Sequence, residues 1–335
     1  MVLLSGIGRG VARAERAADG VWRVERLLEG VRVNILAVDP SGRSTVWAGT
    51  QADGVWRSDD RGCTWRRAGL DAVTVKSLAV DPRDPQVVVA GTKPAGLWVT
   101  RDGGDTWNEL GGFRAVRRWW WWSPADPPGW VPYVSGVAIS PTDPDVLVAG
   151  VEVGGIHLSE DGGRTWRGHQ RGADLDCHDL RFHARDGRWL YEAGGGGPAV
   201  SRDGGRSWRH PLEGLAGRYT MACAADPERP EVWYVSAAPT FAWRAPWRMP
   251  LAHHDGHAQA GVYRSTGGAH WERLGGGLPQ PLDHMPYALV TVPEWPGHLY
   301  AGLAHGQVWH TSDHGDSWTR LPVDLGGVRR TMVVS

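Results

Sequence analysis

Lysine and cysteine are scarce in this 335-residue sequence. Lys76 and Lys93 are the two lysines among 36 Lys+Arg residues, which leaves 34 arginines, and the formal net charge is −1. Without a basic excess, the chain is not expected to bind nucleic acid. The three cysteines, Cys63, Cys177 and Cys223, are far apart and odd in number, which argues against a disulfide framework and against a cysteine zinc site.

Long apolar runs are also absent. No stretch reaches the roughly 18 residues that a membrane-spanning helix requires. Residues 1–6 lack the basic region and the long apolar core of a signal peptide. The sequence therefore predicts a cytoplasmic protein with no membrane segment. The run Gly194–Gly197 lacks the Lys-Ser/Thr pair and the helix that follow a phosphate-binding loop, so no nucleotide cofactor is expected.

Glycine and tryptophan, in contrast, are abundant, with 47 and 21 residues. Many belong to an eight-residue pattern with Ser or Thr first, Asp third, Gly fifth, Ser or Thr seventh and Trp eighth. In such a pattern the Asp side chain accepts hydrogen bonds from nearby N–H groups, the Gly permits a positive φ, and the Trp buries a large area. The pattern therefore predicts a structural turn between two strands. It occurs five times, at 58–65, 100–107, 159–166, 201–208 and 311–318, with a degenerate sixth copy at 264–271.

A second motif precedes most of these turns. It places Asp-Pro or Ser-Pro between two short apolar segments, as in 35–40 followed by 46–50 and in 77–82 followed by 88–92. Alternating apolar residues on both sides of the turns are typical of strands. Each repeat therefore contains four strands, A to D, with Asp-Pro in the A–B turn and the eight-residue pattern in the C–D turn. Four-stranded units repeated in this way are the blades of a β-propeller.

These repeats resemble the blades of Asp-box (BNR-repeat) β-propeller proteins, which include sialidases, xyloglucan-cleaving hydrolases, sortilin-like receptors and photosystem II assembly factors. The resemblance covers almost the whole chain and implies an all-β fold. It says little about function, because the box is structural in all of these families. The N-terminal Arg-Ile-Pro type motif of sialidases is absent. The xyloglucan-cleaving enzymes use a cleft between two propellers, whereas this chain supplies one.

The repeats predict a single seven-bladed propeller domain over residues 1–335. Residues 1–28 hold three strands without a box, and residues 327–335 resemble a lone A strand. The C-terminal strand is therefore expected to complete the N-terminal blade, which removes open sheet edges. A six-bladed ring with loose ends is the alternative. The blades are predicted at 327–335 with 1–28, then at 31–69, 73–110, 131–168, 174–212, 218–274 and 285–322.

Two insertions interrupt the regular spacing of the repeats, and functional loops are expected at such departures. Residues 111–132 lie in a D–A connection and residues 238–260 in a B–C connection. Because strands alternate in direction within a blade, both insertions are expected on the face opposite the boxes, at the mouth of the central channel. We expect a small-molecule or glycan ligand to bind there.

Histidines gather in the connections of the same face. Imidazole rings from different blades could bind a divalent transition metal there, with carboxylates completing or orienting them. A polar loop that is merely rich in histidine is the alternative. The expected metal ligands are His178, His254, His257, His284 and His305.

Catalytic roles on this rim are expected for Glu192, Glu152 and Tyr219. Glu192 stands where the other blades have Ala or Val, so we expect it to be partly buried with a raised pKa; an ion pair with an arginine is the alternative.

Substrate contacts are expected from the tryptophans of the insertions and from lysines and tyrosines of the rim. Packing into a small core within the insertions is the alternative role for the tryptophans. An exposed cluster of tryptophans could also support a homo-oligomer. The expected substrate contacts are Trp119, Trp122, Trp130, Trp243, Trp247, Lys76, Lys93, Tyr133 and Tyr287.

Three functions are open at this level. The first is a metal-dependent hydrolase or lyase, which we favour narrowly because it explains why the histidines lie on one side. The second is a metal-free glycoside hydrolase that uses paired carboxylates. The third is a non-catalytic scaffold that binds a protein or a glycan.

Overall fold

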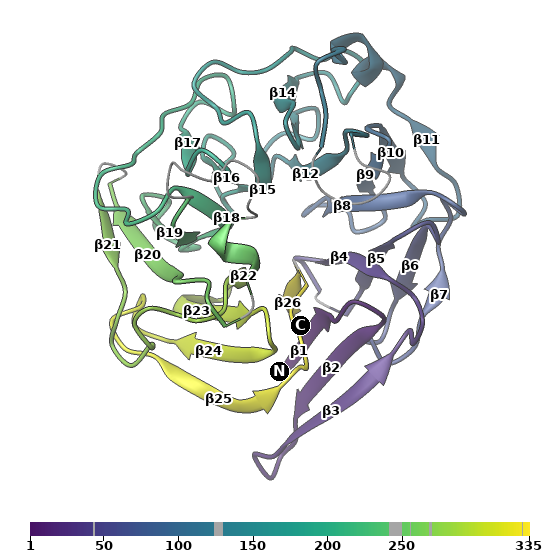
Figure 1. Ribbon diagram of the computed structural model, residues 1–335. Helices are drawn as coiled ribbons and strands as arrows, with labels where there is room; N and C mark the ends of the chain where they lie inside the picture. Colours follow the sequence, from purple (N-terminus) through teal and green to yellow (C-terminus); the bar gives the residue numbers. More distant parts are fainter. Residues whose placement is uncertain (43, 124–129, 241–249, 255, 268–269, 330) are drawn as a thin grey trace.

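The computed structural model describes residues 1–42, 44–123, 130–240, 250–254, 256–267, 270–329 and 331–335. These residues form a ring of seven radially arranged sheets (Figure 1), with two short 3₁₀ helices and no α-helix among them. In the described part of the chain, no helix is long and apolar enough to cross a membrane. The all-β, seven-bladed propeller predicted from the repeats is confirmed.

Blades 2 to 7 are each built from consecutive antiparallel strands, and the innermost strand comes first in the chain (Figure 1). Blade 2 contains β4 (Val33–Val38), β5 (Val46–Thr50), β6 (Val55–Ser58) and β7 (Arg66–Arg67), and blade 3 contains β8 (Thr74–Val80), β9 (Val88–Lys93), β10 (Leu97–Thr100) and β11 (Asn108–Glu109). Blade 4 contains β12 (Val134–Ile139), β13 (Leu147–Val151) and β14 (Gly155–Ser159), and blade 5 contains β15 (Cys177–Phe182), β16 (Leu190–Gly194) and β17 (Ala199–Ser201). Blade 6 contains β18 (Tyr219–Ala225), β19 (Val232–Ala238), β20 (Gly261–Thr266) and β21 (Trp271–Arg273), and blade 7 contains β22 (Pro286–Val292), β23 (Trp295–Leu303), β24 (Gln307–Thr311) and β25 (Thr319–Asp324).

Blade 1 joins the two ends of the chain. Backbone hydrogen bonds of 2.8 and 2.9 Å connect Val2 and Ser335 in both directions, and the last strand pairs antiparallel with the first. The predicted closure by the C-terminal strand is thus confirmed, and the six-bladed alternative is wrong. From the inside outward, the blade consists of β26 (Met332–Val334), β1 (Val2–Gly6), β2 (Val11–Arg16) and β3 (Trp22–Leu27).

The eight-residue boxes form C–D turns that share the same hydrogen bonds. In blade 4 the Asp161 carboxylate accepts bonds from Ser159 Oγ at 2.9 Å, from Thr165 N–H at 2.8 Å and from Thr165 Oγ at 2.6 Å. The bonds from Thr165 lower the pKa of Asp161 to about 2, because they stabilise the charged form. Equivalent bonds are made by the carboxylates of Asp60, Asp102, Asp203 and Asp313.

Replacing Asp161 with alanine is expected to lower the melting temperature by a few degrees without opening the ring. The pKa of Asp161 is lower in the folded state than in the unfolded chain. Its contribution to stability is therefore present above about pH 4 and is lost as the pH falls toward about 2. Thermal melts followed by circular dichroism should show a gap between wild type and variant at neutral pH that closes at about pH 2. A gap of the same size at both pH values would contradict this account.

The box tryptophans fill the junctions between blades. Trp107 of blade 3 donates from Nε1 to Ala68 O of blade 2 at 2.8 Å, and Trp271 of blade 6 donates to Pro211 O of blade 5 at 2.7 Å. A box glycine makes this close approach possible, because a Cβ on Gly104 would lie 2.8 Å from the Ala68 side chain. The box turn of one blade therefore covers the outer part of the preceding blade.

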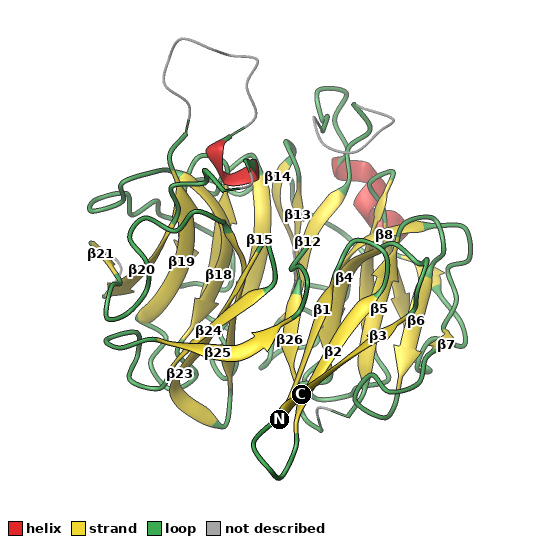
Figure 2. Ribbon diagram, turned by 60° about the horizontal axis from the view of Figure 1, so that its bottom comes forward, coloured by secondary structure: helices red, strands yellow, loops and turns green. Residues whose placement is uncertain are grey.

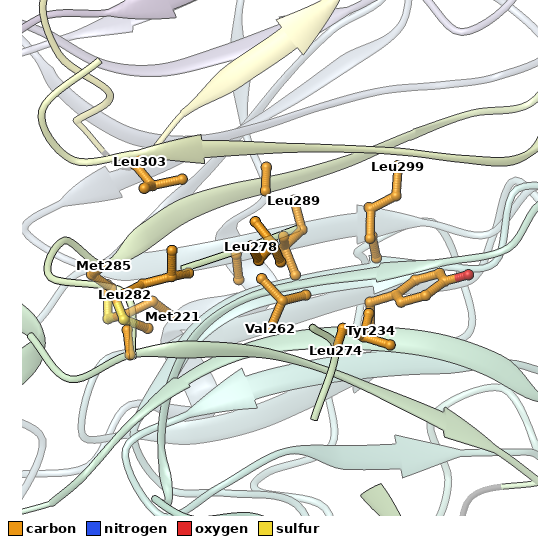
Figure 3. Close-up of a cluster of buried hydrophobic side chains, with 14 of the residues drawn as sticks. Met221, Tyr234, Val262, Leu274, Leu278, Leu282, Met285, Leu289, Leu299 and Leu303 are labelled. Carbon is orange, nitrogen blue, oxygen red and sulfur yellow. The ribbon is translucent and has the colours of Figure 1, made fainter. Parts of the chain in front are cut away.

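Hydrophobic cores lie between neighbouring blades. Figure 3 shows Met221, Tyr234 and Val262 of blade 6 packed with Leu289 and Leu299 of blade 7. Burial of apolar surface is the main favourable contribution to folding, so each blade depends on its two neighbours for stability.

Six of the inner strands carry a β-bulge at the same place, which inserts one extra residue and redirects the side chains that follow. In three of these bulges a side chain bonds to a backbone carbonyl oxygen of the following blade: Asn34, Ser135 and His178 make these bonds at 2.9, 2.7 and 2.7 Å. The bulges therefore also connect neighbouring blades. They lie at Asn34, Lys76, Ser135, His178, Met221–Ala222 and Tyr287.

The two 3₁₀ helices mark one end of the ring. η1 (Gly111–Val116) follows β11, and η2 (Leu251–His253) lies between β19 and β20. Figure 2 shows both helices at the same end. We call this end the insertion face, and we call the opposite end, which carries the C–D turns, the box face.

Candidate functional site

Four rings form a row on the insertion face, across blades 5, 6 and 7. The Tyr219 hydroxyl lies 2.8 Å from His253 Nε2, and the Tyr287 hydroxyl lies 2.7 Å from His253 Nδ1. The ring of His178 lies 4.8 Å from that of Tyr219. Tyr219 and Tyr287 were predicted site residues, whereas His253 was not, although it belongs to the 238–260 insertion. Its position on η2, between the two tyrosines, attaches this insertion to the inner strands.

His178 is held through both of its ring nitrogens. Nδ1 lies 2.7 Å from Thr220 O, and Nε2 lies 3.5 Å from Asp176 Oδ2. Burial alone would lower the pKa of His178, but the hydrogen bond to Asp176 and the charge of Asp176 outweigh it, and the pKa is raised. A protonated imidazole has no free lone pair for a metal. The arrangement therefore favours a structural link between blades 5 and 6.

Two of the other predicted metal ligands form a pair. His284 and His305 have ring centroids 4.0 Å apart, and the buried Nδ1 of each has no hydrogen-bond partner among the described residues. His254 and His257 are exposed beside η2. Across the described ranges, no group of three or more His, Cys, Asp or Glu side chains could hold a metal ion. The metal site stays a prediction.

Glu192 and Glu152 lie behind the surface of the rim, and both are buried. Glu192 Oε2 accepts a bond from Asp174 N–H at 3.0 Å, whereas Oε1 has no partner among the described residues. Burial raises the pKa of Glu192 well above its ordinary value, and the negative charge of Asp174 adds to the effect. Ser123 Oγ lies 3.3 Å from Glu152 Oε1. A catalytic role for either carboxyl group stays a prediction, because a substrate would have to reach a buried oxygen.

Three predicted contact residues form a cluster at the inner edge of blades 3 and 4. Lys76 Nζ lies 5.0 Å and Lys93 Nζ lies 5.8 Å from the centre of the Tyr133 ring. All three residues are buried, and the attraction between a cation and an aromatic ring is larger when the cation is desolvated. The cluster therefore lies beneath the rim rather than on its surface.

The insertion at residues 111–132 is anchored by its own small core. Phe113, Val116 and Trp121 are buried with apolar side chains of blades 3 and 4. The ring of Trp121 lies 4.9 Å from the ring of His157, a buried residue of β14. This small core is the alternative role expected for the insertion tryptophans, and one residue of the run 119–122 fills it.

The remaining tryptophans of this insertion are turned outward. Trp119 is 95% exposed and Trp130 is 74% exposed, and Trp120 and Trp122 are exposed to a smaller degree. The rings of Trp122 and Trp130 lie 5.4 Å apart. The backbone N–H of Trp130 donates to Ser123 O at 2.9 Å. We call these four residues the tryptophan patch.

The predicted tryptophan contacts thus divide into two groups. Trp119, Trp122 and Trp130 are exposed and open to a ligand. Trp243 and Trp247 lie outside the described residues.

No family model and no curated protein matches the sequence. Among solved structures, the chain is similar to a GH74 xyloglucanase from Xanthomonas campestris, with a TM-score of 0.65 and 21% identity over 94% of this chain and 52% of that chain. It is also similar to an ancestral GH74 enzyme (TM-score 0.64, 17% identity, 86% of this chain and 38% of that chain). A third similar structure is YCF48 bound to D1 peptide (TM-score 0.55, 15% identity, 85% of this chain and 79% of that chain). The chain spans about half or less of the two GH74 enzymes, and at these identities the likeness establishes the propeller fold.

Proposed function

We propose that this propeller is a non-catalytic binding protein that docks a protein partner through the tryptophan patch. The observation that carries the proposal is the exposure of four tryptophans on one insertion whose base is buried between blades 3 and 4. Exposed apolar groups of this kind mark interaction sites. Tryptophan is also enriched among the residues that dominate binding energy at protein interfaces.

The charges beside the patch indicate an acidic partner. Arg117 and Arg118 directly precede the tryptophans and are exposed. Arg114 is already paired, since its Nε lies 2.7 Å from Glu109 Oε1. The sequence of the insertion, residues 111–132, holds three arginines and one acidic residue, Asp126. We therefore expect a partner segment with apolar side chains flanked by Asp or Glu, because complementary charge steers association and fixes register.

A glycoside hydrolase is less well supported. Catalysis by paired carboxylates needs two carboxyl groups that flank the scissile bond, roughly 5–10 Å apart. The rim carboxyl groups of Glu152, Asp174 and Glu192 are buried, and the partly exposed Asp176 lies 3.5 Å from His178 Nε2. The similar YCF48 propeller, in contrast, has a peptide bound, so a fold of this shape can serve peptide binding.

A metal-dependent hydrolase or lyase is the second candidate, and the pair of His284 and His305 favours it. Burial and the neighbouring His284 lower the pKa of His305, and neutral imidazole is the form that binds a metal. A zinc site needs at least a third protein ligand, and the described residues supply no such group. Partner binding therefore ranks first.

Replacing Trp119 and Trp130 together with serine is expected to abolish partner binding and leave the fold intact. Both side chains are mostly exposed, so the melting temperature should change little. Loss of two aromatic anchors should weaken binding by at least about a hundredfold. The probe is a set of peptides selected on the wild-type protein from a random displayed library, with affinities measured by calorimetry. We expect the selected peptides to combine aromatic or aliphatic residues with Asp or Glu.

Val24→Ser is the control, because Val24 is an exposed apolar residue of β3 in blade 1 and lies outside the tryptophan patch. Selected peptides should bind this control as they bind wild type. Peptides that bind the double variant equally well would overturn the docking site. Glycans that bind wild type but not the double variant would replace the protein partner with a glycan, and dimerisation lost in the variant would replace it with a second copy of the chain. Stoichiometric metal in untagged wild type together with hydrolysis of a test substrate would move the second candidate to first place.

A further inference from the structure

A cavity of about 660 Å³ opens on the box face between blades 7 and 1. It lies at the opposite end of the ring from the tryptophan patch and is independent of the function proposed above. Ring-bearing side chains line much of it. They are Trp22, Trp295, His298, Tyr300 and His310.

The cavity exists because blade 1 has no box turn. In blade 1 the connection from β2 to β3 is a short hairpin turn, in which Ala17 N–H bonds to Val21 O at 2.9 Å. Figures 1 and 2 show that this hairpin projects away from the ring. In the other blades a box turn lies over the preceding blade, whereas here blade 7 is left partly uncovered.

The uncovered residues occupy the place that a box tryptophan covers elsewhere. Leu321 and Pro322 follow the box tryptophan of blade 7 at the same distance as Ala68 and Gly69 follow that of blade 2. Trp107 of the next blade covers Ala68 and Gly69: its Nε1 bonds to Ala68 O, and a Cβ on Gly69 would lie 2.7 Å from the indole ring. In blade 7 the equivalent pair lines the open cavity. The indole ring of Trp107 thus fills, between blades 2 and 3, the space that forms the cavity between blades 7 and 1.

His298 and His310 supply polar atoms to this cavity. His298 Nδ1 lies 3.1 Å from His310 Nε2, so one ring donates and the other accepts. The second nitrogen of each ring makes no hydrogen bond to the described residues. Tyr300 stacks on His310 with ring centroids 4.4 Å apart. Burial and the neighbouring His298 lower the pKa of His310 to about 4, so His310 is uncharged at neutral pH and can accept a hydrogen bond.

We infer that this cavity binds a planar aromatic group that carries an N–H donor, such as an indole ring. The apolar faces of Trp22 and Trp295, both partly exposed in the lining, suit a flat ring, and an imidazole nitrogen can accept its N–H. Such a group comes either from the side chain of a bound peptide or from a small heteroaromatic molecule.

Binding is tested with indole and with N-acetyltryptophanamide, by saturation-transfer NMR and by calorimetry. We expect a Kd for indole on the order of 1 mM, as is usual for a ligand of this size. Trp295→Ala should weaken binding at least about fivefold, since it removes one aromatic wall. Ala18→Trp, at an exposed residue that lines the cavity, should fill the space and abolish binding. Leu175→Ala, which changes an exposed apolar residue between blades 4 and 5, is the control and should bind both probes as wild type does.

The two sources are distinguished by comparing the probes. A peptide that contains tryptophan and binds at least about tenfold more tightly than indole assigns the cavity to a peptide side chain. Equal affinities of indole and the peptide assign it to a small heteroaromatic ligand. Absence of saturation transfer from both probes would overturn the inference, and so would binding that neither Trp295→Ala nor Ala18→Trp reduces. Binding of these probes is assigned to the box face through the cavity variants. A lack of binding there would therefore leave the function proposed for the tryptophan patch unaffected.

Discussion

A chain that ends at residue 326 is expected to lose the cooperative unfolding transition of the complete ring. The deletion removes β26, which pairs with Leu3, Leu4 and Ser5 of β1, and it exposes the inner edge of blade 1. It also removes Thr331, whose hydroxyl oxygen accepts a bond from Leu36 N–H of blade 2 at 3.0 Å. One short segment therefore connects three blades, since it also packs against blade 7.

The expected loss is comparable with the whole stability of a typical protein. Val328, Met332 and Val334 are buried in a core shared by blades 7 and 1, and Val333 is buried in a core shared by blades 1 and 2. Burying one such side chain is worth about 1.5–3 kcal/mol, against a total free energy of unfolding of about 5–15 kcal/mol. We expect the truncated chain to aggregate or to unfold gradually.

Thermal melts followed by circular dichroism, together with size-exclusion chromatography, measure this outcome. Met332→Ala provides an intermediate case and should lower the free energy of unfolding by about 2–5 kcal/mol, as measured in urea. Arg329→Ala changes an exposed side chain of the same segment and should melt like wild type. A truncated chain that melts as cooperatively as wild type, at the same temperature, would show that β26 contributes little to the stability of the ring.

The fold could be predicted because the repeats carry local chemistry. Ser159, Asp161 and Thr165 belong to one eight-residue segment and bond to one another, so the turn is specified without knowledge of distant contacts. The closure could be predicted because three strands at one end of the chain and one at the other add up to a blade. Neither inference required the direction of any single side chain.

The arrangement of the candidate site could not be predicted as well as the fold, because it depends on the directions in which individual side chains point. A period of two assigns each strand residue to a side, but the bulge at His178 inserts an extra residue and changes the assignment. His178 consequently bonds to the next blade. The run 119–122 poses the same problem, since Trp121 is buried and Trp119 is exposed although the four residues are identical in sequence. The lack of a box in residues 1–28 was visible in the sequence, but the cavity that it leaves between blades 7 and 1 was not.

Replacing Glu192 with glutamine is expected to stabilise the protein at alkaline pH and to flatten the dependence of its stability on pH. Glu192 has no exposed surface, and burial raises the pKa of its carboxyl group. A carboxyl group whose pKa is higher in the folded protein than in the unfolded chain stabilises the fold while it is protonated. This contribution to the free energy of unfolding is complete below the pKa of the unfolded chain, about 4.3, and is lost as the pH rises through the pKa of the folded protein. Between these two values the loss amounts to about 1.4 kcal/mol per pH unit.

Glutamine keeps an acceptor for the Asp174 N–H, which lies 3.0 Å from Glu192 Oε2, but it cannot ionise. Urea unfolding of wild type and Glu192→Gln between about pH 5 and about pH 9 should therefore show two free-energy curves that separate as the pH rises, with the variant above. Glu29→Gln, which changes an exposed carboxyl group, should give a curve parallel to wild type. Parallel curves for Glu192→Gln and wild type would mean that the Glu192 carboxyl is solvated or paired in solution. Separating curves would mean that the rim of blade 5 is built on a neutral acid, which fits a structural position or a general acid and does not fit a carboxylate nucleophile.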